Sequence, residues 1–66
     1  MSNAIKALLA REEGKLARRL ENHEATKLEQ EVLGDNATVR GKLERQAEAI
    51  KESRANIKKL KASLDK

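Results

Sequence analysis

The chain has 66 residues, enough for one small domain, and it contains no Cys, Pro, Phe, Tyr or Trp. The absence of cysteine excludes a disulfide framework and thiolate chemistry. Charged residues make up 39% of the chain with both signs interspersed, and the net charge is only +4. Ala, Glu, Lys, Arg and Leu dominate, which is typical of long helices and coiled coils. We therefore expect one all-α module spanning residues 1–66.

The N-terminal fifteen residues contain apolar runs of only a few residues. Such runs are too short for a membrane span or for the apolar region of a secretory signal. We therefore expect a cytoplasmic protein that does not engage a membrane.

The first predicted helix covers about residues 3–33. Leu9 and Leu16 are seven residues apart, but this series continues to the polar residues His23 and Gln30. The other large apolar residues follow a different spacing, which predicts an apolar stripe that rotates around the helix. The residues expected in the buried seam of this helix are Leu9, Leu16, Leu20 and Leu28.

A turn is predicted at residues 34–36. Gly34 suits the left-handed backbone position that ends many helices, because it has no β-carbon to clash. Asp35 or Asn36 can then cap the following helix by accepting a hydrogen bond from a free backbone N–H group. An α-helical hairpin is thus favoured, with one continuous long helix as the alternative.

The second predicted helix covers about residues 36–65 and carries the clearest pattern in the chain. Large apolar residues recur every seven positions, which is the spacing of a helix that packs lengthwise against another helix. A second series at seven-residue spacing begins at Val39 and ends at Leu60. The polar residues Gln46 and Ser53 interrupt it, and we expect them to weaken the seam and fix its register. The seam residues expected here are Val39, Leu43, Ile50, Ile57, Leu60 and Leu64.

The apolar content is small for an independent fold. Besides Met1, the chain has nine Leu, three Ile and two Val. Ordering each residue costs about 1.5 kcal/mol, and burying a large aliphatic side chain returns roughly 1.5–3 kcal/mol. We therefore expect coiled-coil packing that completes a bundle by oligomerisation. A dimer forming a four-helix bundle is favoured over a different helical partner, and the sense of pairing stays open.

Positive charge is concentrated in the second half of the chain. Residues 36–66 carry nine Lys or Arg and four Asp or Glu, whereas residues 1–35 carry six and seven. The basic residues are expected to match acidic residues of the first helix, within the chain or between subunits. Examples are Glu31 with Arg40 and Glu13 with Lys58. The charged edge comprises Arg40, Lys51, Arg54, Lys58 and Lys61.

Catalytic chemistry is not expected from this sequence. His23 is the only histidine, and no serine has a base at helical spacing, so no arrangement for nucleophilic catalysis is present. We expect no cofactor and no metal site. His23 occupies a seam-like position, where packing against a neighbouring helix is the simpler role.

Two segments resemble parts of known families. Leu43-Glu44-Arg45, Ile50 and the run 57–63 resemble the C-terminal dimerising coiled coil of the mitochondrial ATPase inhibitor protein. Residues 50–64 are similar to the second helix of a small helical-hairpin protein of the large ribosomal subunit. Each family's upstream motif is absent, so neither function is assigned.

The sequence thus predicts a non-enzymatic helical interaction module, such as an adaptor, regulator or assembly factor. The alternative is a small basic protein associated with nucleic acid or the ribosome, which would use the charged edge to contact phosphates in a salt-dependent manner. No aromatic residue is available to stack on bases, and this weighs against single-strand recognition.

Overall fold

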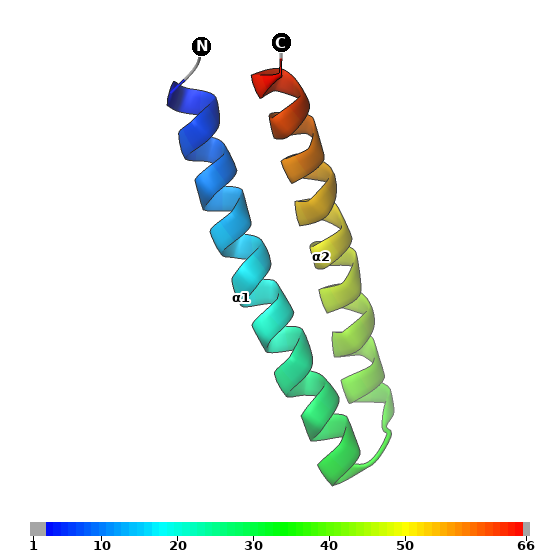
Figure 1. Ribbon diagram of the computed structural model, residues 1–66. Helices are drawn as coiled ribbons and strands as arrows, with labels where there is room; N and C mark the ends of the chain where they lie inside the picture. The colour runs from blue at the N-terminus through cyan, green and yellow to red at the C-terminus, as the bar shows by residue number, and fades with distance from the viewer. Residues whose placement is uncertain (1–2, 66) are drawn as a thin grey trace.

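Two long antiparallel helices make up the part of the chain that the computed structural model describes, residues 3–65. Helix α1 spans Asn3–Leu33 and helix α2 spans Ala37–Leu64. They lie side by side along their whole length and form a rod of 49 × 14 × 12 Å (Figure 1). The predicted helical hairpin is confirmed, and the alternative of one continuous helix is wrong.

The turn between the helices is formed as the sequence predicts. Gly34 has a φ of +87°, and its N–H group donates to the carbonyl of Gln30 at 2.9 Å. Asn36 then caps α2, because its side-chain oxygen accepts a hydrogen bond from the Val39 N–H group at 2.9 Å. Asp35 accepts a hydrogen bond from the Gln30 amide at 3.1 Å. At each end of the turn, a hydrogen bond therefore satisfies one terminal backbone group of the adjoining helix.

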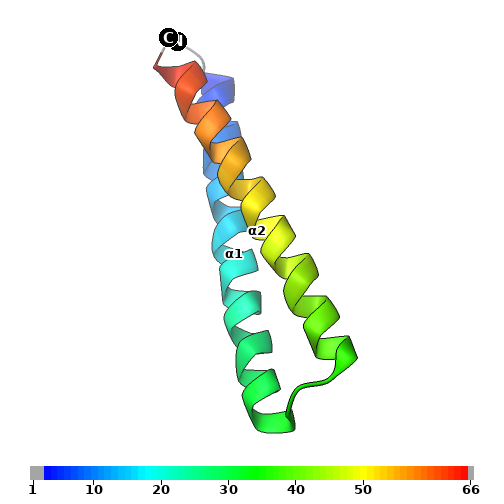
Figure 2. The same ribbon diagram turned by 90° about the vertical axis from the view of Figure 1, so that its right-hand side faces the viewer.

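Viewed from the side, the helices cross at a small angle (Figure 2). Residues facing the partner helix recur at alternating steps of three and four in both helices, which is the pattern of lengthwise packing. They form two parallel rows in each helix. We name the front row Leu9, Leu16, His23 and Gln30 of α1 with Leu43, Ile50, Ile57 and Leu64 of α2. The back row is Ile5, Glu12, Arg19 and Thr26 of α1 with Val39, Gln46, Ser53 and Leu60 of α2.

The large apolar residues of the first helix rotate away from the seam toward the turn, where Val32 is 80% exposed. The inward positions of α1 keep a regular seven-residue period, but several of them carry polar side chains. Thr26 is buried with 6% of its surface exposed, whereas Leu28 is 60% exposed and Leu20 is 37% exposed. Within the hairpin, neither leucine lies in the buried seam: Leu20 borders the groove at the front of the seam, and Leu28 lies on the outer surface of α1.

The hairpin buries few side chains completely. The most buried are Ser53, Val39, Thr26 and Ile50, with 0%, 3%, 6% and 7% of their surface exposed. The chain exposes 5181 Å² of surface, whereas a compact monomer of its 7.4 kDa mass exposes roughly 4200 Å². Two helices alone leave much of each other uncovered.

Over residues 3–65, neither helix contains a stretch apolar enough to cross a lipid bilayer.

Candidate interaction surface

The back row is joined across the helices by polar contacts. Near the centre of the rod, Arg19 extends from α1 to α2 and donates from Nη1 to the Ala49 carbonyl at 2.9 Å and to the Ser53 hydroxyl. Ser53 is fully buried. A buried hydroxyl is stable there because it has a charged donor as its partner.

A second group of back-row contacts lies closer to the turn. Gln46 donates from its amide nitrogen to Thr26 Oγ1 at 2.9 Å, and Thr26 donates in turn to the Asn22 carbonyl at 3.0 Å. The Gln46 amide oxygen lies 3.0 Å from His23 Nδ1, which places the ring proton on Nδ1. One glutamine thus connects both rows of α1 to α2.

The third contact joins the helices near their free ends. Asn56 donates to Glu12 at 3.2 Å, and the Glu12 side chain is only 12% exposed. This hydrogen bond, with smaller effects from Lys15, Ser53 and Arg19, lowers the pKa of Glu12 more than its partial burial raises it. Glu12 therefore stays ionised in the folded hairpin.

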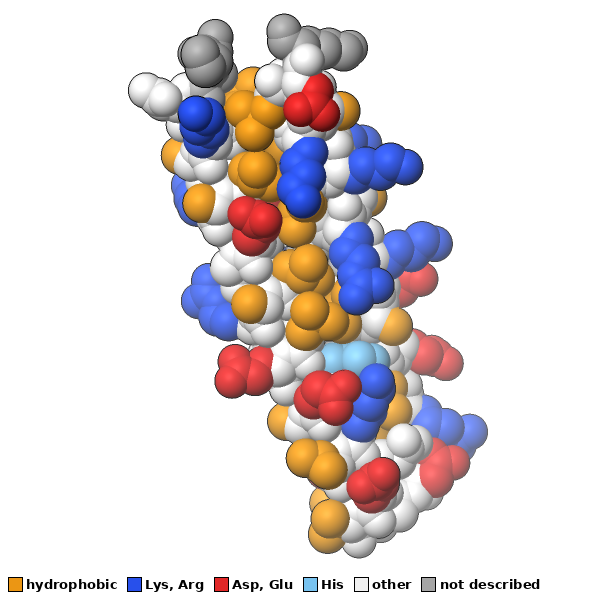
Figure 3. All heavy atoms as spheres, viewed as in Figure 1, with side chains coloured by type: hydrophobic (Ala, Val, Ile, Leu, Met, Phe, Trp, Pro, Cys, Tyr) orange, Lys and Arg blue, Asp and Glu red, His pale blue; other side chains and the backbone are white. Residues whose placement is uncertain are grey.

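The front row is more apolar and more open than the back row. Three of the four most buried residues belong to the back row, whereas most front-row side chains are only half-buried. Shallow grooves along this side are lined by the apolar residues Leu20, Leu43, Ala47 and Ile50 and by His23. Figure 3 shows the result: hydrophobic side chains run between the helices, with the histidine among them. We call this surface the apolar face, defined by Leu9, Leu16, Leu20, Leu43, Ala47, Ile50, Ile57 and Leu64.

Charged side chains flank the apolar face. Along α2 the charged edge predicted from the sequence is exposed on this side, and basic side chains gather there in Figure 3. We call it the basic edge: Arg40, Lys51, Arg54, Lys58 and Lys61. Along α1 the corresponding flank carries Glu13, Glu24 and Glu31, which we call the acidic edge.

The expected ion pairs between these edges do not form within the chain. Arg40 contacts Asp35 at 3.4 Å instead of Glu31, and Glu24 pairs with Lys27 at 3.6 Å on its own helix. Among residues 3–65, neither Glu13 nor Lys58 has an ion-pair partner. The reason is geometric: both edges point outward from the seam, with the apolar face between them.

Other exposed apolar side chains lie away from the apolar face. Leu8 is 50% exposed on the opposite side of α1, one position before the front-row residue Leu9. Near the turn, Leu28, Val32 and Leu33 are 60%, 80% and 69% exposed. They spread around the end of α1 and do not line up along the helix.

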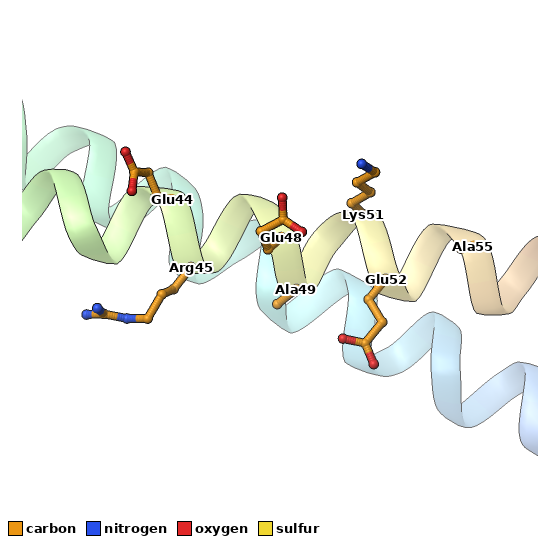
Figure 4. Close-up of a pocket in the computed structure, with 7 residues that line it drawn as sticks. All are labelled: Glu44, Arg45, Glu48, Ala49, Lys51, Glu52 and Ala55. Carbon is orange, nitrogen blue, oxygen red and sulfur yellow. The ribbon is translucent and has the colours of Figure 1, made fainter.

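The hollows on this molecule are open grooves. One on the outer side of α2 is lined by that helix alone, from Glu44 to Ala55. Its charged side chains diverge, with Glu44 and Lys51 on one side of the helix and Arg45 and Glu52 on the other (Figure 4). Across residues 3–65, no group of three or more His, Cys, Asp or Glu is arranged to hold a metal ion.

Most residues predicted for the seam meet in the hairpin, in the front row or in the back row. The inward positions of Glu12, Arg19 and Thr26 were not predicted from the sequence. These residues follow Ile5 at seven-residue intervals, which is the spacing of a seam, but their side chains are polar and seam residues were expected to be apolar.

No family model matches the chain, and no curated protein or solved structure matches it either.

Proposed function

We propose that this chain is a non-enzymatic helical interaction module that acts by packing its apolar face against other helices. The observation that carries the proposal is the contrast between the two sides of the hairpin. The back row is closed by cross-helix hydrogen bonds, whereas the front row holds the larger share of apolar side chains and leaves most of them only partly buried.

The small core of the hairpin also favours association. A core of this size rarely supplies more than about 3–5 kcal/mol of stability. Here part of that core is polar, and such contacts add about 0.5–1.5 kcal/mol each. Covering the apolar face with further helices would remove more leucine and isoleucine surface from water, at roughly 25 cal/mol per Å².

Leu20 and Leu8 provide a matched test. Both are leucines of α1, with 37% and 50% of their surface exposed, but only Leu20 belongs to the apolar face. We expect Leu20→Lys to weaken association about tenfold or more, because a charge would have to be buried or excluded at the interface. Leu8→Lys should leave association unchanged. Sedimentation velocity at several chain concentrations measures both effects, and equal behaviour of the two variants would contradict the proposal.

A second candidate is binding of duplex nucleic acid by the basic edge. Its five cations are exposed on one side of α2, as a phosphate-binding surface requires. Glu13, Glu24 and Glu31 lie across the same face and would repel a phosphate backbone, so we rank this function second. Duplex binding that weakens steeply with salt and is reduced by Arg54→Glu would favour it.

A further inference from the structure

Several charged residues around the apolar face do not form ion pairs within the single hairpin. Glu13, Glu31 and Lys58 are exposed and have no ion-pair partner among residues 3–65. The acidic edge lies along α1 and the basic edge along α2, with Lys27 on the α1 side and Glu44 on the α2 side. A surface with this layout is complementary to a copy of itself turned so that opposite edges meet.

The hydrogen bonds between the helices set the relative heights of α1 and α2. Glu12 contacts Asn56, Arg19 contacts Ala49, and His23 contacts Gln46. Arg19 also contacts Ser53, and Thr26 contacts Gln46, so seven residues forward along α1 match seven residues back along α2. Extending this register, to within one residue, places four pairs of opposite charge at similar heights on the front of the rod: Lys6 with Asp65, Glu13 with Lys58, Lys27 with Glu44, and Glu31 with Arg40.

We infer that the occupant of the apolar face is a second copy of this chain, related by a two-fold axis parallel to the helices. The inference rests on the proposed function. In this arrangement, α1 of each copy lies over α2 of the other, and both turns are at the same end. The front rows of the two copies form a shared core, which completes a four-helix bundle.

Every facing position on the edges of this dimer is then compatible. The four pairs of opposite charge lie across the interface, and each occurs twice by symmetry. The remaining charged positions face uncharged side chains at the same heights: Lys51 faces Leu20, Arg54 faces Ala17, Lys61 faces Ala10, and Glu24 faces Ala47. No two like charges are opposed.

The other face-to-face arrangement has its two-fold axis perpendicular to the helices. It lays α1 over α1 and α2 over α2, with the turns at opposite ends. When the two copies overlap fully, opposite charges meet at Lys6 with Glu31, Arg40 with Asp65 and Glu44 with Lys61, but Glu13 faces Glu24 and Lys51 faces Arg54. Opposed like charges disfavour an interface and are a common means of selecting register and orientation.

Glu13 and Lys58 allow a direct test by charge reversal. In the inferred dimer, Glu13→Lys places two cations opposite each other, and Lys58→Glu places two anions opposite each other. We expect each variant to raise the dimer dissociation constant about tenfold at low salt. An equimolar mixture of the two should restore wild-type affinity, because each mixed dimer regains two opposite pairs. Glu21→Lys and Lys59→Glu, on other sides of the helices, are the matched controls and should have no effect.

The readout is sedimentation velocity of each variant, of the controls and of the mixture. Tighter association of Glu13→Lys alone would indicate the perpendicular axis, since that lysine would face Glu24. Loss of affinity without recovery in the mixture would show that the charges act within one chain. Either result overturns the inference and leaves the proposed function intact. A wild-type chain that stays unfolded at every concentration also overturns it in favour of a different helical partner, whereas a stably folded monomer overturns both.

Discussion

Gly14 and Gly34 differ in what a methyl group would meet. A β-carbon at Gly14 has no atom within 4 Å, and the residue lies in the middle of α1. Close helix contact within the hairpin therefore does not explain this glycine. Gly34 also has open space around it, but its φ of +87° is one that side chains with a β-carbon rarely adopt.

These environments predict opposite effects of the same substitution. Gly14→Ala should raise the free energy of unfolding by about 0.5–1 kcal/mol, because alanine favours the helix. Gly34→Ala should lower it by about 1–2 kcal/mol, because the left-handed backbone becomes strained. Urea denaturation at one fixed chain concentration measures both. A loss of stability in Gly14→Ala would mean that another molecule covers this side of α1.

At the scale of the helices, register depends on polar contacts as well as on apolar ones. The hairpin, its turn and the bounds of α1 could be predicted, because Gly34 and Asn36 have strong local preferences and α2 has a regular apolar period. The inward face of α1 could not, since the assumption that seam residues are apolar assigned Leu20 and Leu28 to the seam. Arg19 and Thr26 face inward because Ser53 and Gln46 offer partners on the other helix, and a single-helix pattern does not contain this information.

The contact between Glu12 and Asn56 makes the pairing of the helices depend on pH. Because the pKa of Glu12 is lowered in the folded state, its carboxylate contributes stability above the ordinary glutamate pKa of about 4.3. That contribution is lost as the pH falls through the lowered value. We expect wild type to be more stable than Glu12→Gln at pH 7 and the difference to shrink at pH 3.

The measurement is the urea midpoint of both proteins at each pH. Glu21→Gln, in an exposed position on the outer side of α1, is the control and should show no such change. A difference between wild type and Glu12→Gln that is equally large at pH 3 and pH 7 would contradict the assigned role of the carboxylate.

At the scale of the whole molecule, the two sides of the rod contribute differently. The back row holds α1 and α2 in one register but buries mainly polar groups. The front row carries most of the leucine and isoleucine of the seam, and the hairpin leaves it partly open (Figure 3). Because neither side closes a complete apolar core, we expect folding and association to be coupled, as they are in many small obligate dimers.

Helix content and mass, followed together on dilution, test this account most directly. Circular dichroism reports the helix content, and light scattering reports the mass of the same samples. We predict that both decrease together, from a helical assembly of at least twice the 7.4 kDa chain mass to a largely unfolded single chain. A fully helical species of 7.4 kDa that persists at every concentration would contradict the account.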